Sequence, residues 1–165
     1  MTRELSRWGV GLSIVVSAGA YAAIAGLITW LWPEVFIISM IPYRAFLAAG
    51  IIMLVIGVPM LIFGGRAAMR AYDSEELATT GIFSCVRNPV YSAWIVFLIP
   101  GLVLLSRSWP MFLTPFVAYV VFKARIGREH EYLENRFGEG YRQYRAQVNE
   151  LIPWSRRKPI HQRKQ

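Results

Sequence analysis

AFLAAGIIMLVIGVPMLIFGG, residues 45–65, contains no charged side chain over 21 positions. A helix of about 20 apolar residues crosses the hydrocarbon core of a bilayer, so this stretch predicts a membrane-spanning helix. Residues 9–32 form another uncharged run, of 24 residues. That run is longer than the apolar core of a signal peptide and predicts a retained first helix. The two runs place the chain among integral membrane proteins.

Two shorter uncharged runs follow, over residues 89–106 and 108–122. A run of 15 residues, such as the second of these, is also typical of a buried helix in a soluble core, so three spans are the alternative. Next to two clear spans, these proline-containing runs favour a kinked helical hairpin. The predicted fold is therefore an all-α membrane protein with four transmembrane helices, the last two a kinked hairpin, followed by cytoplasmic C-terminal helices. One membrane-embedded domain, residues 1–153, then carries a basic tail, residues 154–165.

Small residues recur along one face of each of the first two runs and predict close helix packing. They are Ala18, Ala22 and Gly26 in the first run, and Gly50, Gly57 and Gly64 in the second.

The net charge of +8 is distributed unevenly along the chain. With four spans, sixteen of the eighteen Lys and Arg residues lie on the side of both termini. Because basic residues gather in cytoplasmic loops, we expect both termini to be cytoplasmic. Membrane flanks then account for the charge, and we expect no nucleic-acid partner. No charged residue or histidine lies inside the four runs, which argues against an ion or proton transporter.

Metal and disulfide chemistry are not expected. The single cysteine, Cys85, excludes an intrachain disulfide and a thiolate metal cluster. The two histidines, His130 and His161, form no metal-ligand pattern with nearby residues.

The polar chemistry collects in two cytoplasmic segments. The first ends in Arg87-Asn88-Pro89, where Pro89 suits the first turn of the third span and Asn88 its N-cap. Capping alone explains these residues as well as a site does. A helix N-terminus also attracts anions, and Arg87 adds a guanidinium fork suited to a carboxylate.

The second segment follows the fourth run. Apolar residues recur at helical spacing around Glu129, which is the one charged residue on that face. Arg125, four residues earlier, is its expected partner. Gly138 and Gly140 are expected to end this helix, and a second short helix would carry Tyr141.

These two segments resemble the membrane-embedded methyltransferase superfamily of isoprenylcysteine carboxyl methyltransferases and phospholipid N-methyltransferases. The resemblance covers residues 77–153, in the order motif, helical hairpin, motif. The matching residues are Leu77, Thr79, Gly81, Phe83, Arg87, Pro89 and Tyr91, then Glu129, Leu133, Phe137, Gly138, Tyr141, Tyr144, Val148, Ile152 and Pro153. Two positions depart from the family pattern: Asn88 stands where the family has His, and His130 stands where it has a second Glu.

The resemblance implies an S-adenosyl-L-methionine-dependent integral membrane methyltransferase, with the cofactor held at the cytoplasmic face. The acceptor would be lipophilic: the carboxylate of an isoprenylcysteine-like substrate, or a lipid amine or thiol. The implied cofactor-binding residues are Gly81, Arg87, Asn88, Pro89, Tyr91, Glu129, Leu133 and Tyr141. The implied catalytic residues are Arg125, Arg128 and Glu129.

Two other functions fit the same sequence. One is a non-catalytic four-helix membrane scaffold or partner subunit, which the departures at Asn88 and His130 allow. The other is an NADPH-dependent membrane reductase, although the chain has no glycine-rich dinucleotide fingerprint.

Overall fold

The computed structural model describes residues 9–74 and 76–153. Within these ranges every regular element is helical, apart from an isolated bridge between Ile37 and Ser108. The prediction of an all-α membrane protein is therefore confirmed. The elements in order are α1 (Gly9–Leu31), α2 (Pro33–Phe36), α3 (Tyr43–Ser74), η1 (Gly81–Ser84), α4 (Pro89–Ser92), η2 (Ala93–Leu98), α5 (Ile99–Ser106), η3 (Pro110–Leu113) and α6 (Thr114–Gln147).

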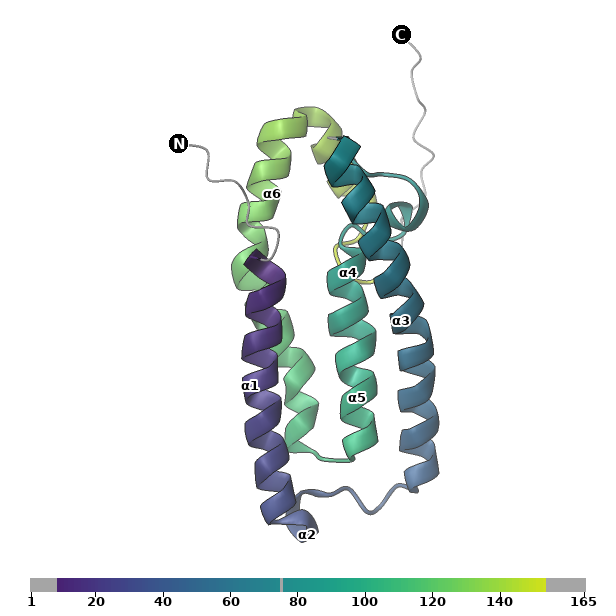
Figure 1. Cartoon of the computed structure of the whole chain (residues 1–165), viewed down its shortest axis with the longest axis vertical. Coiled ribbons are helices and arrows are strands. Elements are labelled where there is room, and N and C mark those ends of the chain that lie inside the picture. Colours follow the sequence, from purple (N-terminus) through teal and green to yellow (C-terminus); the bar gives the residue numbers. More distant parts are fainter. Residues whose placement is uncertain (1–8, 75, 154–165) are drawn as a thin grey trace.

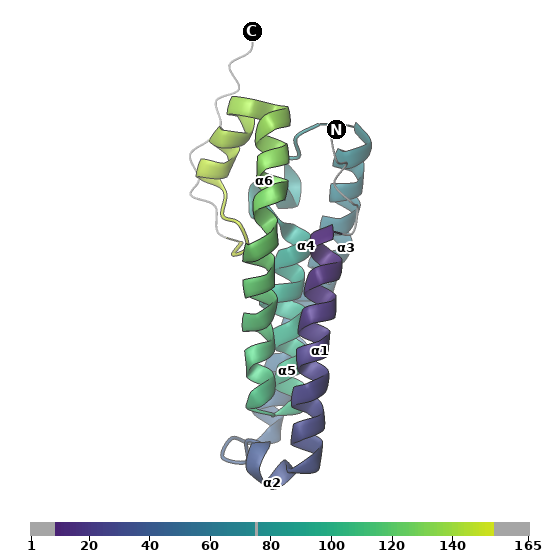
Figure 2. The same ribbon diagram turned by 90° about the vertical axis from the view of Figure 1, so that its left-hand side faces the viewer.

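Three of the helical stretches are long and apolar enough to cross a membrane: Val10–Leu31, Tyr43–Tyr72 and Pro89–Ser106. They correspond to the first three runs predicted from the sequence, the first being one residue shorter at each end than the predicted 9–32. The fourth run, residues 108–122, lies in η3 and the first part of α6, and it is not among these three stretches. This part of α6 lies beside α1 (Figure 1 and Figure 2).

The third helical stretch, the first half of the predicted kinked hairpin, changes helix type along its length. The third helical stretch begins as α4, continues as a π-helical segment, η2, and becomes α5 with Pro100 in its first turn. Pro100 has no backbone N–H to donate to the preceding turn, and such interruptions commonly accompany π-helical segments.

The hydrophobic core joins three helical stretches. Its buried side chains come from α1, from η2, from α6 and from the segment after α6, and the group is Ile14, Ala18, Ile95, Ala118, Phe122, Ile126 and Leu151. The third stretch therefore packs against α1 and α6 on one side, and α3 covers its other side (Figure 1).

Glycines on α3 allow its close contact with the third stretch. A Cβ atom at Gly50 would lie 2.9 Å from the carbonyl oxygen of Gly101, and one at Gly64 would lie 2.9 Å from Cβ of Pro89. Gly57 makes an equally tight contact. The predicted packing role of these three glycines is confirmed. The same prediction is wrong for Gly26, where an added Cβ would meet no atom within 4 Å, because Gly26 lines an open pocket with Ser106 and Met111 rather than a close helix contact.

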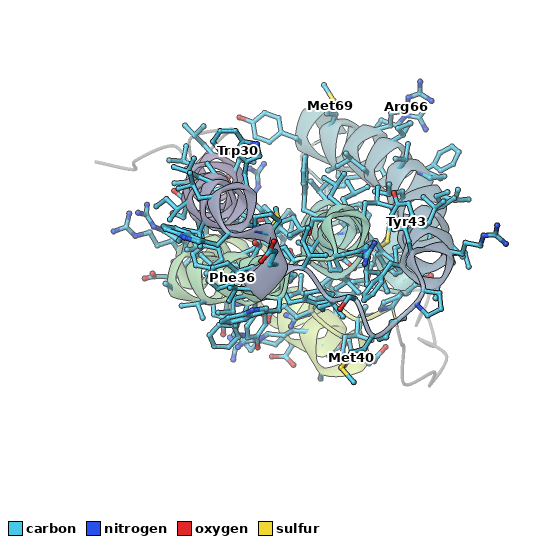
Figure 3. All side chains as sticks on the ribbon, turned by 90° about the horizontal axis from the view of Figure 1, so that it is seen from below. Trp30, Phe36, Met40, Tyr43, Arg66 and Met69 are labelled. Carbon is cyan, nitrogen blue, oxygen red and sulfur yellow. The ribbon has the colours of Figure 1, made fainter. Side chains whose placement is uncertain are left out.

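The end of the bundle that carries α2 is held by the turn before η3. Arg107 adopts a left-handed backbone conformation, with φ of 53°, and its guanidinium donates to the carbonyl oxygen of Ile38 at 2.8 Å. The hydroxyls of Thr29 and Ser108 form a buried hydrogen bond of 2.6 Å. Figure 3 views this end, where Trp30 and Met40 are strongly exposed. Exposed aromatic and apolar side chains of this kind are typical of a membrane interface.

Candidate functional site

The candidate site lies at the opposite end of the bundle, where α6 reverses direction. Gly138 has φ of 51° and ψ of −124°, values outside the helical region, and α6 folds back at this point (Figure 1 and Figure 2). The helix break predicted at Gly138 is confirmed, because a left-handed φ suits a residue without a Cβ atom. Gly140 lies within the returning part of α6 and does not end it.

The reversal brings the C-terminal segment against the Arg-Asn-Pro motif. The backbone N–H of Arg87 donates to the carbonyl oxygen of Asn149 at 2.9 Å, and that of Asn88 donates to the carbonyl oxygen of Glu150 at 3.2 Å. Ser92, which is fully buried, donates its hydroxyl to the carbonyl oxygen of Leu151. Two segments about sixty residues apart in the sequence therefore form one structural unit.

The Arg-Asn-Pro motif begins α4 as expected, but the side chain of Asn88 does not cap the helix. Pro89 occupies the first turn and Asn88 the N-cap position. The predicted position of Asn88 is confirmed, whereas a capping hydrogen bond from its side chain is absent. The amide of Asn88 is therefore left for another partner.

Buried hydrogen-bond donors without a partner gather at this point. Among the described residues, five buried side-chain polar atoms lack a hydrogen-bond partner, and four of them belong to Arg87, Asn88 and His130. These four are Nε and Nη1 of Arg87, Nδ2 of Asn88 and Nε2 of His130. A buried donor without a partner costs about 1–3 kcal/mol. The group fits an anionic ligand such as a carboxylate, which accepts hydrogen bonds and donates none.

The surroundings of His130 disfavour a positive charge on its imidazole. Burial lowers the pKa of His130, and the positive charge of Arg87 lowers this pKa further. A neutral imidazole with its proton on Nε2 donates one hydrogen bond from that atom. In that tautomer His130 adds a hydrogen-bond donor to those of Arg87 and Asn88.

Glu129 lies next to the motif but not with the partner expected from its own helix. Its carboxylate accepts a hydrogen bond from the hydroxyl of Tyr91 at 3.3 Å. Within the described part of the chain Glu129 forms no ion pair with Arg125, so that predicted pairing is wrong. Burial raises the pKa of Glu129, and the hydrogen bond from Tyr91 partly opposes this rise. The Tyr91 ring also packs against Phe122, with ring centroids 5.3 Å apart.

Tyr141 lies near both His130 and the charges of Arg87 and Glu129. It is 2% exposed, and its ring centroid lies 6.3 Å from that of His130. Burial raises the pKa of Tyr141, whereas the charge of Arg87 lowers it and that of Glu129 raises it. Tyr141 is thus close enough to sense both charges. It belongs to a second apolar cluster, with Tyr144, Val148, Leu77, Phe83, Leu133 and Phe137.

The remaining predicted site residues are more peripheral. Arg125 and Arg128 are exposed on α6, and in the described part of the chain neither forms an ion pair or side-chain hydrogen bond. Gly81 is exposed and opens η1 with φ of 62°. The structure therefore groups Arg87, Asn88 and Tyr91 with Glu129 and Tyr141 of α6, and Leu133 packs in the apolar cluster around Tyr141. It does not bring Arg125, Arg128 or Gly81 into that group.

Sequence reasoning misses other polar residues of this region. It weighs His130 as a metal ligand and as a departure from the family pattern, yet His130 supplies one of the unpartnered donors. Tyr144 donates its hydroxyl to the carbonyl oxygen of Phe83 at 2.7 Å and so ties the returning part of α6 to η1. Glu150 is not among the predicted residues, although it is an isolated carboxylate in an apolar stretch, and that signal could have identified it.

An open groove lies on another side of His130. It has a volume of about 410 Å³ and is lined by Gly127, His130, Glu131, Glu134, Asn135, Arg142 and Arg145. Its charged side chains pair with one another, since Glu134 lies 3.3 Å from Arg142 and 3.8 Å from Arg145. Groups of acidic residues, His and Cys able to hold a metal ion are absent from the described residues.

Comparison with known proteins identifies the family. The model of the isoprenylcysteine carboxyl methyltransferase (ICMT) family matches residues 43–135, which is more than half of the chain. The chain belongs to the ICMT family. The match includes Arg87 and Glu129 and extends from the start of α3 into α6, so the resemblance inferred from the two motifs is confirmed.

ICMT relatives with curated names share this region. The chain is 35% identical over 91 residues to a protein-S-isoprenylcysteine O-methyltransferase of Schizosaccharomyces pombe, covering 55% of this chain and 39% of that protein. It is 31% identical over 81 residues to the protein of the same name in Dictyostelium discoideum, covering 49% of this chain and 34% of that protein. The matched segment thus spans well under half the length of these relatives. No solved structure matches the chain.

Proposed function

We propose that this ICMT-family protein transfers a methyl group from S-adenosyl-L-methionine to a lipophilic acceptor at the cytoplasmic membrane face. The observation that carries the proposal is the group of buried donors without partners on Arg87, Asn88 and His130. S-adenosyl-L-methionine carries a carboxylate that these donors match. The names of the relatives, protein-S-isoprenylcysteine O-methyltransferase, favour the carboxylate of an isoprenylcysteine-like acceptor over a lipid amine or thiol.

The residues of the site divide the recognition of the cofactor between them. Arg87, Asn88 and His130 would bind its carboxylate through their unpartnered N–H groups. Glu129 would accept hydrogen bonds from its ammonium or ribose hydroxyl groups. Tyr91 and Tyr141 offer aromatic surface to its adenine or to its cationic centre. When bound, the cofactor supplies a methyl group on a sulfonium, which is the electrophile of the reaction.

The acceptor needs little proton transfer. A carboxylate is already ionised near neutral pH, so the protein has to align it and exclude water rather than provide a strong base. Arg125 and Arg128 are exposed on α6, directly after residues 114–122, the part of that helix that we propose as the fourth span. We assign them the role of orienting an acidic, lipid-borne acceptor that enters from the bilayer. Leu133, Pro89 and Gly81 would shape the cofactor site through the cluster, the helix start and the turn that they form.

The same proposal includes the membrane topology. We propose four spans, with the first part of α6 as the fourth, and both termini in the cytoplasm. The position of α6 beside α1 supports this arrangement (Figure 2). With four spans the candidate site lies on the side where the basic residues gather.

A methyl-transfer assay tests the proposed function. Purified protein in detergent is incubated with S-adenosyl-L-methionine labelled on the transferred methyl group and with S-farnesylated N-acetylcysteine. We expect label in a base-labile methyl ester and none when the acceptor carboxylate is already esterified. Transfer to phosphatidylethanolamine or to a lipophilic thiol instead would assign another acceptor. Binding of the cofactor product without transfer to any acceptor would contradict the enzymatic proposal and favour the scaffold.

A further inference from the structure

Glu150 joins two positions of α6 through its side chain. Its Oε2 atom lies 2.7 Å from Nζ of Lys123, and its Oε1 atom lies 3.4 Å from Nε2 of His130. The second contact lacks hydrogen-bond geometry, so Nε2 of His130 keeps no hydrogen-bond partner. Lys123 and His130 are seven residues apart, which is about two turns of one helix face. The side chain of Glu150 is only 17% exposed and that of His130 only 12%, so the carboxylate lies in a sheltered position between the two.

The backbone of the same segment holds the start of α4. The carbonyl oxygen of Glu150 accepts the backbone N–H of Asn88, and that of Asn149 accepts the backbone N–H of Arg87. The next carbonyl oxygen, of Leu151, accepts the hydroxyl of Ser92. Glu150 thus connects α6 through its side chain with the Arg-Asn-Pro motif through its backbone.

We infer that Glu150 is a positioning residue: through its ion pair with Lys123 and its backbone contact with Asn88, it holds the part of α6 that carries His130 in register with the Arg-Asn-Pro motif, so that their unpartnered polar atoms converge on one ligand. This inference rests on the proposed function. The free donors of Arg87, Asn88 and His130 come from the start of α4 and from α6, and a residue bound to both sides fixes their separation. A loss of this link would leave each donor in place on its own helix but change their mutual geometry.

The charges around His130 agree with this role. Arg87, Lys123 and Arg145 disfavour a positive charge on the imidazole, and Glu150 favours one. The ring of Tyr141 also lies near the imidazole, with centroids 6.3 Å apart, and Glu131, Glu134, Arg142 and Arg145 line the groove on its other side. Glu150 is therefore the acidic group that the imidazole senses in this arrangement. A glutamate at position 130, as in the family pattern, would instead place a second carboxylate beside that of Glu150, and the two negative charges would repel each other.

The test replaces the carboxylate with an amide of the same shape. The Glu150→Gln variant and the matched control Glu139→Gln, whose side chain is 68% exposed in a surface ion pair, are titrated calorimetrically with S-adenosylhomocysteine. We expect Glu150→Gln to bind about fivefold more weakly than the wild type, the scale of one partly exposed ion pair. The control should bind within twofold of the wild type. Glu150→Asp keeps the charge and should recover part of the loss.

A second readout separates positioning from general stability. The chain has only two histidines, so the imidazole signal of His130 can be followed by NMR during a pH titration and identified with His130→Gln. Removal of the Glu150 carboxylate should move the His130 titration to lower pH, and Glu139→Gln should leave it unchanged. Unchanged affinity, or an unmoved His130 titration, in Glu150→Gln would overturn the inference. If the wild type itself fails to bind S-adenosylhomocysteine, the proposed function fails instead.

Discussion

Replacement of Arg87 should weaken cofactor binding more than any other single change at the site. Two of its guanidinium nitrogens, Nε and Nη1, are buried without a partner. A hydrogen bond to a charged group contributes about 1.5–3 kcal/mol. If Arg87→Ala removes the equivalent of one such bond, affinity for S-adenosylhomocysteine should fall about ten- to a hundredfold, at 1.4 kcal/mol per factor of ten. His130 and Asn88 would retain the remaining affinity.

The assay is a calorimetric titration of the detergent-purified variants. Arg87→Lys keeps the charge but not the planar fork, so it should recover only part of the lost affinity. Arg70→Ala is the control. Arg70 is exposed near the C-terminal end of α3, and its removal changes the net charge by the same amount as the removal of Arg87. If Arg87→Ala stays folded and binds within twofold of the wild type, Arg87 does not hold the ligand and the assigned site is misplaced.

Three further predictions address the site, the packing and the topology. Burial raises the pKa of Glu129, so its carboxylate takes up a proton at a higher pH than an exposed glutamate does. The affinity for S-adenosylhomocysteine should therefore fall as the pH is lowered through that pKa. Glu129→Gln should bind at least about tenfold more weakly and should not show this fall with pH. Gly50→Ala should lower the melting temperature, because the new Cβ would lie 2.9 Å from a backbone oxygen and overpacking costs about 1–3 kcal/mol. Gly26→Ala is the control and should not lower it, because an added Cβ there meets open space. Equal melting temperatures of the two variants would contradict the packing described. Cys85 is exposed and is the only cysteine of the sequence. A membrane-impermeant maleimide should therefore label the protein in inverted vesicles and not in intact cells. The opposite labelling pattern would refute a cytoplasmic site.

Much of the fold follows from local sequence features. Uncharged runs of about twenty residues identify the first three helical stretches because the bilayer sets that length. Gly50, Gly57 and Gly64 recur every seven residues, so they fall on one face of α3 and mark its contact. The break at Gly138 follows from the freedom of glycine to adopt positive φ. Gly26 shows the limit of the pattern, because the sequence does not say whether a neighbouring helix lies on that face.

The sequence predicts those features of the candidate site that depend on neighbouring residues. It does not predict contacts that form only because α6 reverses direction. The position of Asn88 at the start of α4 follows from the proline after it. The partner of Glu129 does not follow, because spacing rules compare residues of one helix whereas Tyr91 lies on another. Glu150 reaches His130 only after the chain turns at Gly138 and returns to the start of α4. Contacts of this kind are set by tertiary structure alone.

The most direct measurement of the central claim is a calorimetric titration of the wild-type protein with S-adenosylhomocysteine, with NADPH as the control ligand. The donors on Arg87, Asn88 and His130 predict saturable binding of S-adenosylhomocysteine and none of NADPH. A folded protein that binds NADPH, or neither ligand, would contradict the assignment of this site to a methyl-donor cofactor.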